Sequence, residues 1–298
     1  DMFVAYNEIY NIGQNAADCS AIYTGRTYVR TNNEIAYNYV HDSAPLFSQL
    51  INHHRGIYLD DGASGQYVHN NIASQVSYMT SASGKYNRIT NNIIVGESRN
   101  PLNLGVSQYL TSPQMLDPLN KMRNSEKYSE IWLEKYPWLE DVDDIQIFNN
   151  TISSNVTQLP IFKDKEWLSY NNEEESVVNN VVLGVGNYEP FVNPEKQDFR
   201  IKADSEIVKE LPNIPNENNF SMDLISVNSD KIANLKEQFN NSPFNALLPK
   251  ENSTVSKTEN LFFMWQTAKY ADEYEFNLYK ADDLTTPVYT KTTGTNYI

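Results

Sequence analysis

Two adjacent aspartates, Asp60 and Asp61, lie in the stretch GIYLDDGASG (residues 56–65), directly after an apolar run that is typical of a strand. A pair of carboxyl groups can divide the work of a hydrolysis, with one acting as general acid and the other as base or nucleophile. The same residues are also a common turn signal, because aspartate hydrogen-bonds its own backbone and glycine accepts positive φ. Which interpretation holds depends on the elements that position the two side chains.

Those elements repeat along the chain. The template [Ile/Val]-x-x-Asn-x-[apolar] recurs about every 21 to 33 residues, apart from one longer gap. Its six matches are VAYNEI (4–9), IAYNYV (35–40), VHNNIA (68–73), ITNNII (89–94), IFNNTI (147–152) and VVNNVV (177–182), with Asn7, Asn38, Asn71, Asn92, Asn150 and Asn180 at the fourth position. Asparagine tolerates the left-handed backbone of a corner, and stacked asparagines can hydrogen-bond between layers. We therefore expect these six residues to form one line, with neighbouring Cα atoms about 5 Å apart.

A second repeat runs in phase with the first, since AIYTGR (21–26) matches GIYLDD (56–61) 35 residues later. Two repeats with compatible spacing favour a parallel β-helix, a solenoid in which each coil adds a short strand to each sheet. The alternative is an antiparallel sandwich with unrelated Asn-Asn turns. The 38 asparagines and 20 tyrosines also favour an all-β chain, because asparagine is poor in helix interiors and tyrosine suits strands.

Aligning the two matching strands predicts the neighbours of the aspartates. The alignment places Gly25 beside Asp60, Arg26 beside Asp61 and Asp18 opposite His53. Carboxylates on neighbouring coils can lie roughly 5 to 10 Å apart, the range that serves glycoside hydrolysis. We expect Arg26 to hold Asp61 ionised, which leaves Asp60 as the carboxyl group free to act as an acid.

Strand alternation predicts which of these side chains face outward. If Ile57 and Leu59 point into the coil, Tyr58 and Asp60 point out of it, and Tyr23 stacks on Tyr58 as an exposed aromatic pair. An outward aspartate beside outward tyrosine rings indicates a surface on which a ligand docks.

Three histidines are further candidate contacts for that ligand. His53 and His54 precede the GIYLDD strand, and His41 ends IAYNYVHD beside Asp42, whereas His69 is interpreted as a strand residue. Their spacings match no zinc pattern, so no metal site is assigned. Calcium at a corner rich in aspartate and asparagine remains an open alternative.

The composition limits the classes of partner that the protein can have. A net charge of −15 and an isoelectric point near 4.7, without a basic stripe, exclude duplex nucleic acid as a partner. The single Cys19 excludes an internal disulfide and a zinc cluster. No apolar run is long enough for a membrane span. Asp1 already lies in a patterned segment, so we expect the natural N-terminus and an export signal to lie upstream, and we expect a monomer.

The long gap between the fourth and fifth matches predicts a partly helical insertion at about residues 97–143. Asp117-Pro118 is a candidate helix start, and SEKYSEIWLEKYPWLED has helical spacing that ends at Pro137. The insertion either covers the core or forms the wall of a cleft, with Trp132, Tyr136 or Trp138 offered to a sugar ring. Residues 226–250 are polar and contain prolines, which predicts a linker before a last segment at residues 251–298.

Several motifs occur in a fixed order along the chain: IYTGR with an upstream aspartate, NYVHD, GIYLDDGASG, EKYPWL, NNTISSN and FVNPEKQDFRIKADSEIVK. This series resembles the sequences of bacterial right-handed parallel β-helix carbohydrate-active enzymes, most of all glycoside hydrolase family 141. The resemblance covers about residues 1–225. It implies a secreted enzyme acting on plant or host glycans, with fucosidase or xylanase activity. The family pattern Asp-x-Gly-Ala reads Asp18-Cys19-Ser20-Ala21 here.

The last segment resembles half of a fibronectin type III module, a sandwich that takes about 100 residues when complete. LFFMWQTAKYADEYEFNLYK alternates like a strand pair, with inward positions predicted at Phe262, Trp265, Tyr274, Phe276 and Leu278. Such modules accompany extracellular enzymes, which agrees with secretion.

Together these observations predict a secreted glycoside hydrolase acting on a complex polysaccharide. Asp18 and Asp60 are the expected acid and base or nucleophile, and Asp61 and Arg26 are their electrostatic partners. The expected sugar contacts are Tyr23, Arg26, His41, His53, His54 and Tyr58. The rival classes are a polysaccharide lyase, which needs a Lys, Arg, Tyr or His base and often calcium, and a non-catalytic glycan-binding adhesin.

Overall fold

Strands dominate the structure. The computed structural model describes residues 2–13, 16, 18–42, 54–82, 84–96, 101–104, 109–144, 148–161, 176–221, 246–248, 263–265 and 274–293. These ranges contain three α-helices, and most of the other regular elements are β-strands. The expectation of a β-rich chain with little helix is confirmed.

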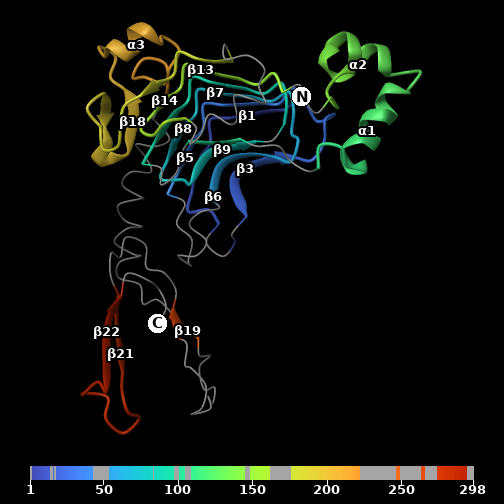
Figure 1. Cartoon of the computed structure of the whole chain (residues 1–298). Helices are drawn as coiled ribbons and strands as arrows, with labels where there is room; N and C mark the ends of the chain where they lie inside the picture. The colour runs from blue at the N-terminus through green and yellow to red at the C-terminus, as the bar shows by residue number, and fades with distance from the viewer. Residues whose placement is uncertain are drawn as a thin grey trace.

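Three parallel sheets make up the main body (Figure 1). Sheet A contains, in order, β1 (Phe3–Ala5), β4 (Glu34–Ala36), β7 (Tyr67–His69), β10 (Arg88–Thr90), β13 (Thr151–Ser153) and β15 (Val177–Val178). Sheet B contains β2 (Glu8–Tyr10), β5 (Tyr39–His41), β8 (Ile72–Ser74), β11 (Ile93–Val95), β14 (Val156–Thr157) and β16 (Val181–Val182). Sheet C contains β3 (Cys19–Gly25), β6 (His54–Asp60), β9 (Tyr78–Ala82) and β12 (Leu102–Leu104).

The chain visits sheets A, B and C in turn, and we call one such pass a coil. The first coil is β1–β2–β3, and each of the next three coils adds one parallel strand to every sheet. β13 to β16 then extend sheets A and B. Parallel pairing between coils excludes the antiparallel sandwich for this part of the chain.

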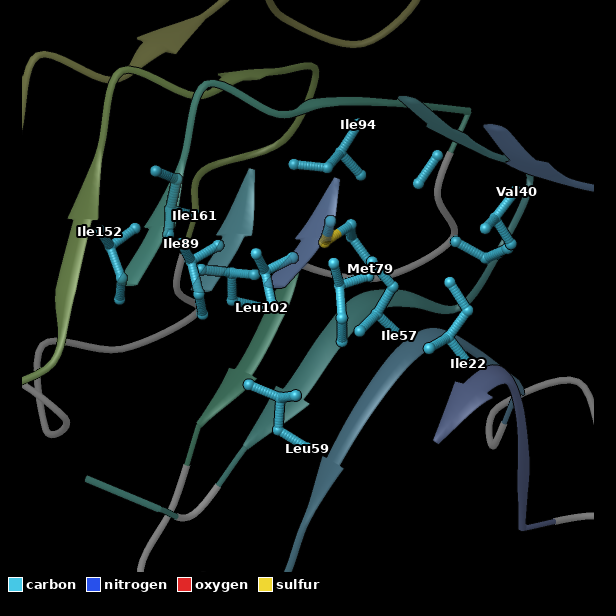
Figure 2. Close-up of a cluster of buried hydrophobic side chains, with 14 of the residues drawn as sticks. Ile22, Val40, Ile57, Leu59, Met79, Ile89, Ile94, Leu102, Ile152 and Ile161 are labelled. Atoms are coloured by element: carbon cyan, nitrogen blue, oxygen red, sulfur yellow. The ribbon is translucent and has the colours of Figure 1, made fainter. Parts of the chain in front are cut away.

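The interior of the coils is a continuous apolar core (Figure 2). The middle residue of each short strand in sheet A points inward, as Ile35, Val68, Ile89 and Ile152 do. Because side chains alternate along a strand, the residues on either side of these positions face outward. The alternation of apolar residues along the strands therefore determines which side chains of each coil face outward and can contact a ligand.

A ladder of asparagines joins successive coils at the corner between sheets A and B. The side-chain oxygen of each member after the first accepts hydrogen bonds of 2.9–3.1 Å from the backbone amide and the side-chain amide of the member one coil earlier. Its members are Asn7, Asn38, Asn71, Asn92, Asn155 and Asn180. The predicted line of asparagines is present, and five of its six predicted members belong to it.

The prediction for Asn150 is wrong. Asn150 belongs to a second ladder at the opposite end of sheet A, formed by Asn33, Gln66, Asn87 and Asn150. Ile152 pairs with Ile89, which puts Asn155 in the place expected for Asn150. Each coil has two such corners. The Asn149-Asn150 pair matches the sequence template, although it lies at the corner of the second ladder.

The left-handed backbone of these corners also differs from the expectation. It falls on the residue before each ladder member rather than on the member itself. The residues with positive φ before the first ladder are Tyr6, Tyr37, Asn70, Asn91, Ser154 and Asn179. The ladder asparagine is therefore selected for its hydrogen bonds and not for its backbone.

The helical insertion lies where the sequence predicts it, after β12. α1 (Pro113–Arg123) begins after Ser112, so the predicted start at Asp117-Pro118 is wrong and Pro118 lies inside the helix. α2 (Ser129–Lys135) and the 3-10 turn η2 (Pro137–Glu140) follow. Together with Tyr28 and Phe148 they enclose a separate apolar cluster. Within the described ranges, no helix is long and apolar enough to cross a membrane.

The outer face of sheet B is covered by a later segment. β17 (Phe191–Asn193) and β18 (Asp198–Ile201) form an antiparallel hairpin, which α3 (Glu206–Glu210) follows. Phe191 and Phe199 pack with Ile72 and Ile93 in one cluster. That face is therefore unavailable to a ligand, whereas sheet C carries the aspartates of the candidate site.

Two short antiparallel pairs are described near the C-terminus. β19 (Ala246–Leu248) pairs with β20 (Met264–Trp265), and β21 (Tyr274–Leu278) pairs with β22 (Tyr289–Thr293). β19 falls inside the range predicted as a linker, most of which lies outside the described residues. Of the predicted inward positions, Tyr274 is buried, Phe276 is half-buried and Leu278 is exposed, while Phe262 and the Trp265 side chain lie outside the described residues.

Candidate active site

The candidate site lies at the carboxyl ends of β3 and β6. The predicted register is confirmed, because Tyr23 pairs with Tyr58 and Gly25 pairs with Asp60. Gly25 is required there, since a Cβ atom at this position would lie 2.7 Å from the Cβ of Asp60. The close approach of the two strands at this point therefore brings the Asp60 side chain against the end of β3.

The aspartates do form a turn. Asp61 and Gly62 have φ values of 27° and 81°, and the amide of Ala63 donates to the carbonyl of Asp60 at 2.9 Å. Arg26, the residue after β3, has a φ of 60° and its amide donates to the same carbonyl. The turn therefore builds the candidate site, because it brings the side chain of Asp61 close to that of Arg26.

One arginine joins both carboxyl groups. Arg26 Nε lies 3.3 Å from an Asp60 oxygen and 3.1 Å from an Asp61 oxygen. These two oxygens are therefore at most about 6.4 Å apart, a range that includes the separation of about 5 Å between the carboxyl groups of retaining glycosidases. The expected division, with Arg26 serving Asp61 and Asp60 left uncompensated, is not what the geometry gives.

Asp60 points outward but is covered. Its side chain is 6% exposed, whereas that of Asp61 is 18% exposed. The Tyr23 hydroxyl donates a 2.8 Å hydrogen bond to Asp60 Oδ2. Alternation predicted the direction of Asp60 correctly, but it could not predict the tyrosine and arginine that cover it.

The two tyrosines meet edge to face rather than stacked. The rings of Tyr23 and Tyr58 are 5.6 Å apart at 84°, and the Tyr23 side chain is 57% exposed. Partial desolvation and the hydrogen bond to Asp60 raise the pKa of Tyr23 to about 12. Burial and a side-chain hydrogen bond with Asp60 raise the pKa of Tyr58 as well. Both hydroxyls therefore stay protonated at neutral pH, and that of Tyr23 donates to Asp60.

Asp18 is not brought next to Asp60. Its exposed carboxylate forms an ion pair of 2.5 Å with Arg55, and the Arg55 guanidinium lies 4.0 Å from the centre of the Tyr58 ring. Asp18 precedes β3 and Asp60 ends β6, so about seven residues of strand, at about 3.3 Å each, separate their backbone positions. Arg55 and Tyr58 stand between the two carboxyl groups.

Two further residues border the site that sequence reasoning did not select. One is Arg55, and the other is Tyr109, whose ring lies 5.5 Å below the Arg26 guanidinium. Strand alternation gave no signal for Arg55, because it has the parity of the inward Ile57 and Leu59, and nothing in the sequence distinguished Tyr109. The insertion aromatics that were selected, Trp132, Tyr136 and Trp138, pack in the helical cluster instead.

The histidines lie elsewhere. His54 is fully buried with Nε2 2.8 Å from the carbonyl of Ala16, and His53 lies outside the described residues. His41 is fully buried in sheet B, stacked between the rings of Tyr10 and Tyr39. His41 and His54 therefore cannot touch a sugar at the candidate site. Among the described residues no group of three or more His, Cys, Asp or Glu side chains could hold a metal ion.

His41 instead forms a buried charged group that predicts a pH dependence of stability. Its ring nitrogens lie 3.0 Å from Asp42 and 3.1 Å from Glu8. Burial lowers the pKa of His41, but the hydrogen bonds to Asp42 and Glu8 outweigh it and raise the pKa above its ordinary value. The stabilisation is therefore complete below pH of about 6.5, and it is lost as pH rises through the raised pKa.

We expect urea denaturation to show a free energy of unfolding that falls as the pH rises above about 6.5, through the raised pKa of His41. His41→Gln should be less stable at pH 6 and should flatten this slope. A slope that survives in His41→Gln would assign it to another group.

Comparison with family models, with curated proteins and with solved structures finds no match for this chain. The interpretation of the site therefore depends on its own geometry. Two carboxyl groups share one arginine beside an exposed tyrosine ring, an arrangement that can hold a polar ligand and can supply an acid and a base.

Proposed function

We propose that this protein is a secreted bacterial enzyme that hydrolyses glycosidic bonds of a complex polysaccharide at Asp60 and Asp61. The observation that carries the proposal is the shared Arg26, which keeps one oxygen of each carboxyl group within about 6.4 Å of the other beside Tyr23. The similarity of GIYLDDGASG and its flanking motifs to glycoside hydrolase family 141 supports the same class of reaction.

We also propose that the coils form a right-handed parallel β-helix and that the C-terminal segment is part of a fibronectin type III module. Crossover connections between parallel strands of one sheet are right-handed in nearly all proteins, and successive strands of sheet A are joined by crossovers that pass through sheet B. The two antiparallel pairs near the C-terminus are compatible with half of a sandwich.

The geometry favours distinct roles for the two aspartates. Asp61 is the more exposed and can approach the glycosidic oxygen as the proton donor. Asp60 is fixed by the Tyr23 hydroxyl and by Arg26, so it is suited to attack the sugar or to activate a water molecule. The exposed Tyr23 ring offers a flat apolar surface with a polar edge, which suits a sugar ring. Asp18, in this proposal, holds Arg55 over Tyr58.

A non-catalytic glycan-binding protein is the second candidate, because Asp60 is almost fully covered and already hydrogen-bonded. A lyase is less favoured. Its base would be Tyr23 or Arg26, and the pKa of Tyr23 near 12 makes its deprotonated form rare at neutral pH.

One set of incubations separates these classes. We expect the purified protein to release reducing ends from xylan or from a fucosylated glycan, without new ultraviolet absorbance on a uronate-containing polysaccharide. A rise in absorbance, which reports an unsaturated sugar, would replace the hydrolase by a lyase. Binding to these polysaccharides without release of any product would support the non-catalytic glycan-binding protein instead.

A further inference from the structure

The aspartate turn of the candidate site packs directly against the helical insertion, whose helices α1 and α2 lie together at one side of the coils (Figure 1). Gly62, which follows Asp61, has a φ of 81°. A Cβ atom at Gly62 would lie 2.5 Å from Met115 Cε and 3.1 Å from Leu110 Cδ2. Met115 and Leu110 are themselves buried in the apolar cluster of the insertion. The turn that carries both aspartates is therefore in close contact with the insertion.

Leu110 is also held from the other strand of the site. Tyr28, which lies two residues after Arg26, is fully buried, and its hydroxyl donates a 2.8 Å hydrogen bond to the carbonyl of Leu110. Arg26 and Tyr28 follow β3, whereas Gly62 follows β6. Residues beyond the ends of both strands therefore fix the same point of the insertion, directly beside the candidate site.

Tyr109 is the chain neighbour of this fixed point. The amide of Ser112 donates to the carbonyl of Tyr109 at 2.9 Å, which forms a turn just before α1. The Tyr109 ring lies 5.5 Å from the guanidinium carbon of Arg26, and Tyr109 is 40% exposed although Leu110 is 2% exposed. Because the C–N bond of the guanidinium is about 1.3 Å long, the ring centre is no more than about 10 Å from the Asp61 oxygen that Arg26 contacts. The fold thus presents an aromatic ring beside the two carboxyl groups.

The other aromatic side chains of the insertion have different surroundings. Trp132, Tyr136 and Trp138 pack in the apolar cluster. Tyr128 is 49% exposed and its ring lies 4.9 Å from the Lys127 ammonium, but within the described part of the chain it contacts no residue of the candidate site. Among the described aromatic residues of the insertion, Tyr109 alone combines an exposed ring with a contact to that site.

From this geometry we infer that the helical insertion forms a substrate-binding wall of the candidate site, and that Tyr109 stacks on the sugar ring next to the bond that is cleaved. The inference rests on the proposed function, which supplies a sugar as the ligand. A tyrosine ring offers a flat apolar face to the C–H groups of a sugar, while Arg26, Asp60 and Asp61 offer hydrogen bonds to its hydroxyl groups. Packing of the insertion on the aspartate turn holds the ring and the carboxyl groups in one arrangement, which lowers the cost of ordering them when the sugar binds.

The test compares Tyr109→Ala with Tyr128→Ala in the whole chain. Binding is measured by affinity electrophoresis in gels that contain xylan or a fucosylated glycan, and turnover is measured by the release of reducing ends. We expect Tyr109→Ala to weaken binding and to raise KM by about tenfold, the scale of one aromatic contact, while kcat stays within about threefold of the parent value. Tyr109→Phe keeps the ring and should bind within about twofold of the parent.

Two controls separate the loss of a sugar contact from a loss of structure. Tyr128→Ala removes an exposed tyrosine of the same insertion and should match the parent in binding and turnover. The melting temperature of Tyr109→Ala should fall by less than about 4 °C, because substitutions at exposed side chains cost little stability.

The outcomes distinguish this inference from the proposed hydrolysis. If the parent cleaves a glycan and Tyr109→Ala binds and cleaves it equally well, the inference is wrong and the hydrolase stands. A fall in kcat with unchanged binding would make Tyr109 a positioning residue for Arg26, and a loss in Tyr109→Phe as large as in Tyr109→Ala would assign the contact to the hydroxyl. Either result overturns the stacking.

The binding measurement alone decides the inference if the parent binds a glycan without cleaving it. In that case weaker binding by Tyr109→Ala supports the wall although the hydrolysis fails, and unchanged binding overturns both. A parent that neither binds nor cleaves either glycan removes the inference together with the proposed function.

Discussion

Asp60→Asn is expected to lower the release of reducing ends, on whichever of the two glycans is cleaved, by about a hundredfold or more. Asparagine keeps the size of the side chain and can still accept the Tyr23 hydroxyl. It carries neither a titratable proton nor a negative charge opposite the developing positive charge of the sugar. Asp61→Asn should cause a loss of the same order, and the double variant should be little worse than either single one, because residues that act as a unit are not additive.

The matched control for Asp60→Asn is Asp18→Asn. The sequence alone predicts that these two variants behave alike. The structure predicts that they differ, because Asp18 is exposed and touches Arg55 rather than the aspartate pair. We expect Asp18→Asn to retain most of the activity. Equal losses in the two variants would contradict the assignment of the acid and base to Asp60 and Asp61.

Stability must be measured beside turnover. An outward aspartate at a turn would be replaced with little effect, but Asp60 is covered and paired with both Tyr23 and Arg26. We therefore expect Asp60→Asn to cost about 1 to 3 kcal/mol of unfolding free energy. Activity is then expressed per folded molecule, with the folded fraction taken from circular dichroism. If activity per folded molecule stays near the parent value while stability falls, GIYLDDGASG is a structural turn.

The sequence predicts the part of this site that depends on register. AIYTGR and GIYLDD have the same apolar alternation, and their pairing follows once the strands are parallel and in phase, as Gly25 opposite Asp60 confirms. Register relates residues across strands, whereas it says little about distance along them. For that reason the sequence predicts Asp18 and Asp60 as one catalytic pair, although the two residues lie at opposite ends of their strands.

The spacing of residues in the sequence also does not predict which side chains cover a given residue. Tyr109 reaches Arg26 from the helical insertion, about 83 positions away. Arg55 pairs with Asp18 although its parity is that of the inward Ile57 and Leu59, so alternation predicts the wrong face for it. The same limit explains the error at Asn150. Both corners of a coil need an amide side chain after a left-handed residue, so a short template cannot tell one corner from the other.

Asn71→Ala is expected to be among the most destabilising single changes in the coils. The Asn71 oxygen accepts the backbone and side-chain amides of Asn38. Its side-chain nitrogen lies within hydrogen-bonding distance of the carbonyls of Ile35 and His69 and of the Asn92 oxygen. Alanine leaves several of these buried groups without a partner, and each such group costs about 1 to 3 kcal/mol. We expect urea denaturation to show a loss of about 3 kcal/mol or more.

Asn7→Ala is the matched control, because Asn7 occupies the same ladder position on the exposed first coil. It should cost less than about 1 kcal/mol, as is usual for exposed substitutions. Similar losses at the two positions would show that the ladder contributes through local turn geometry and not through burial of its hydrogen bonds.

Asn71→Asp separates hydrogen-bond donation from shape. The carboxylate has nearly the same size and can still accept from Asn38, but it cannot donate to the carbonyl oxygens of Ile35 and His69 that face it. Burial and these facing oxygens raise the pKa of the new carboxyl group in the folded state, so its protonated form is favoured there. The loss of stability should therefore be large at pH 7 and should diminish relative to the parent as pH falls toward 4. A loss that does not change with pH would mean that the carboxylate has turned toward solvent, and that the corner can open without unfolding the coils.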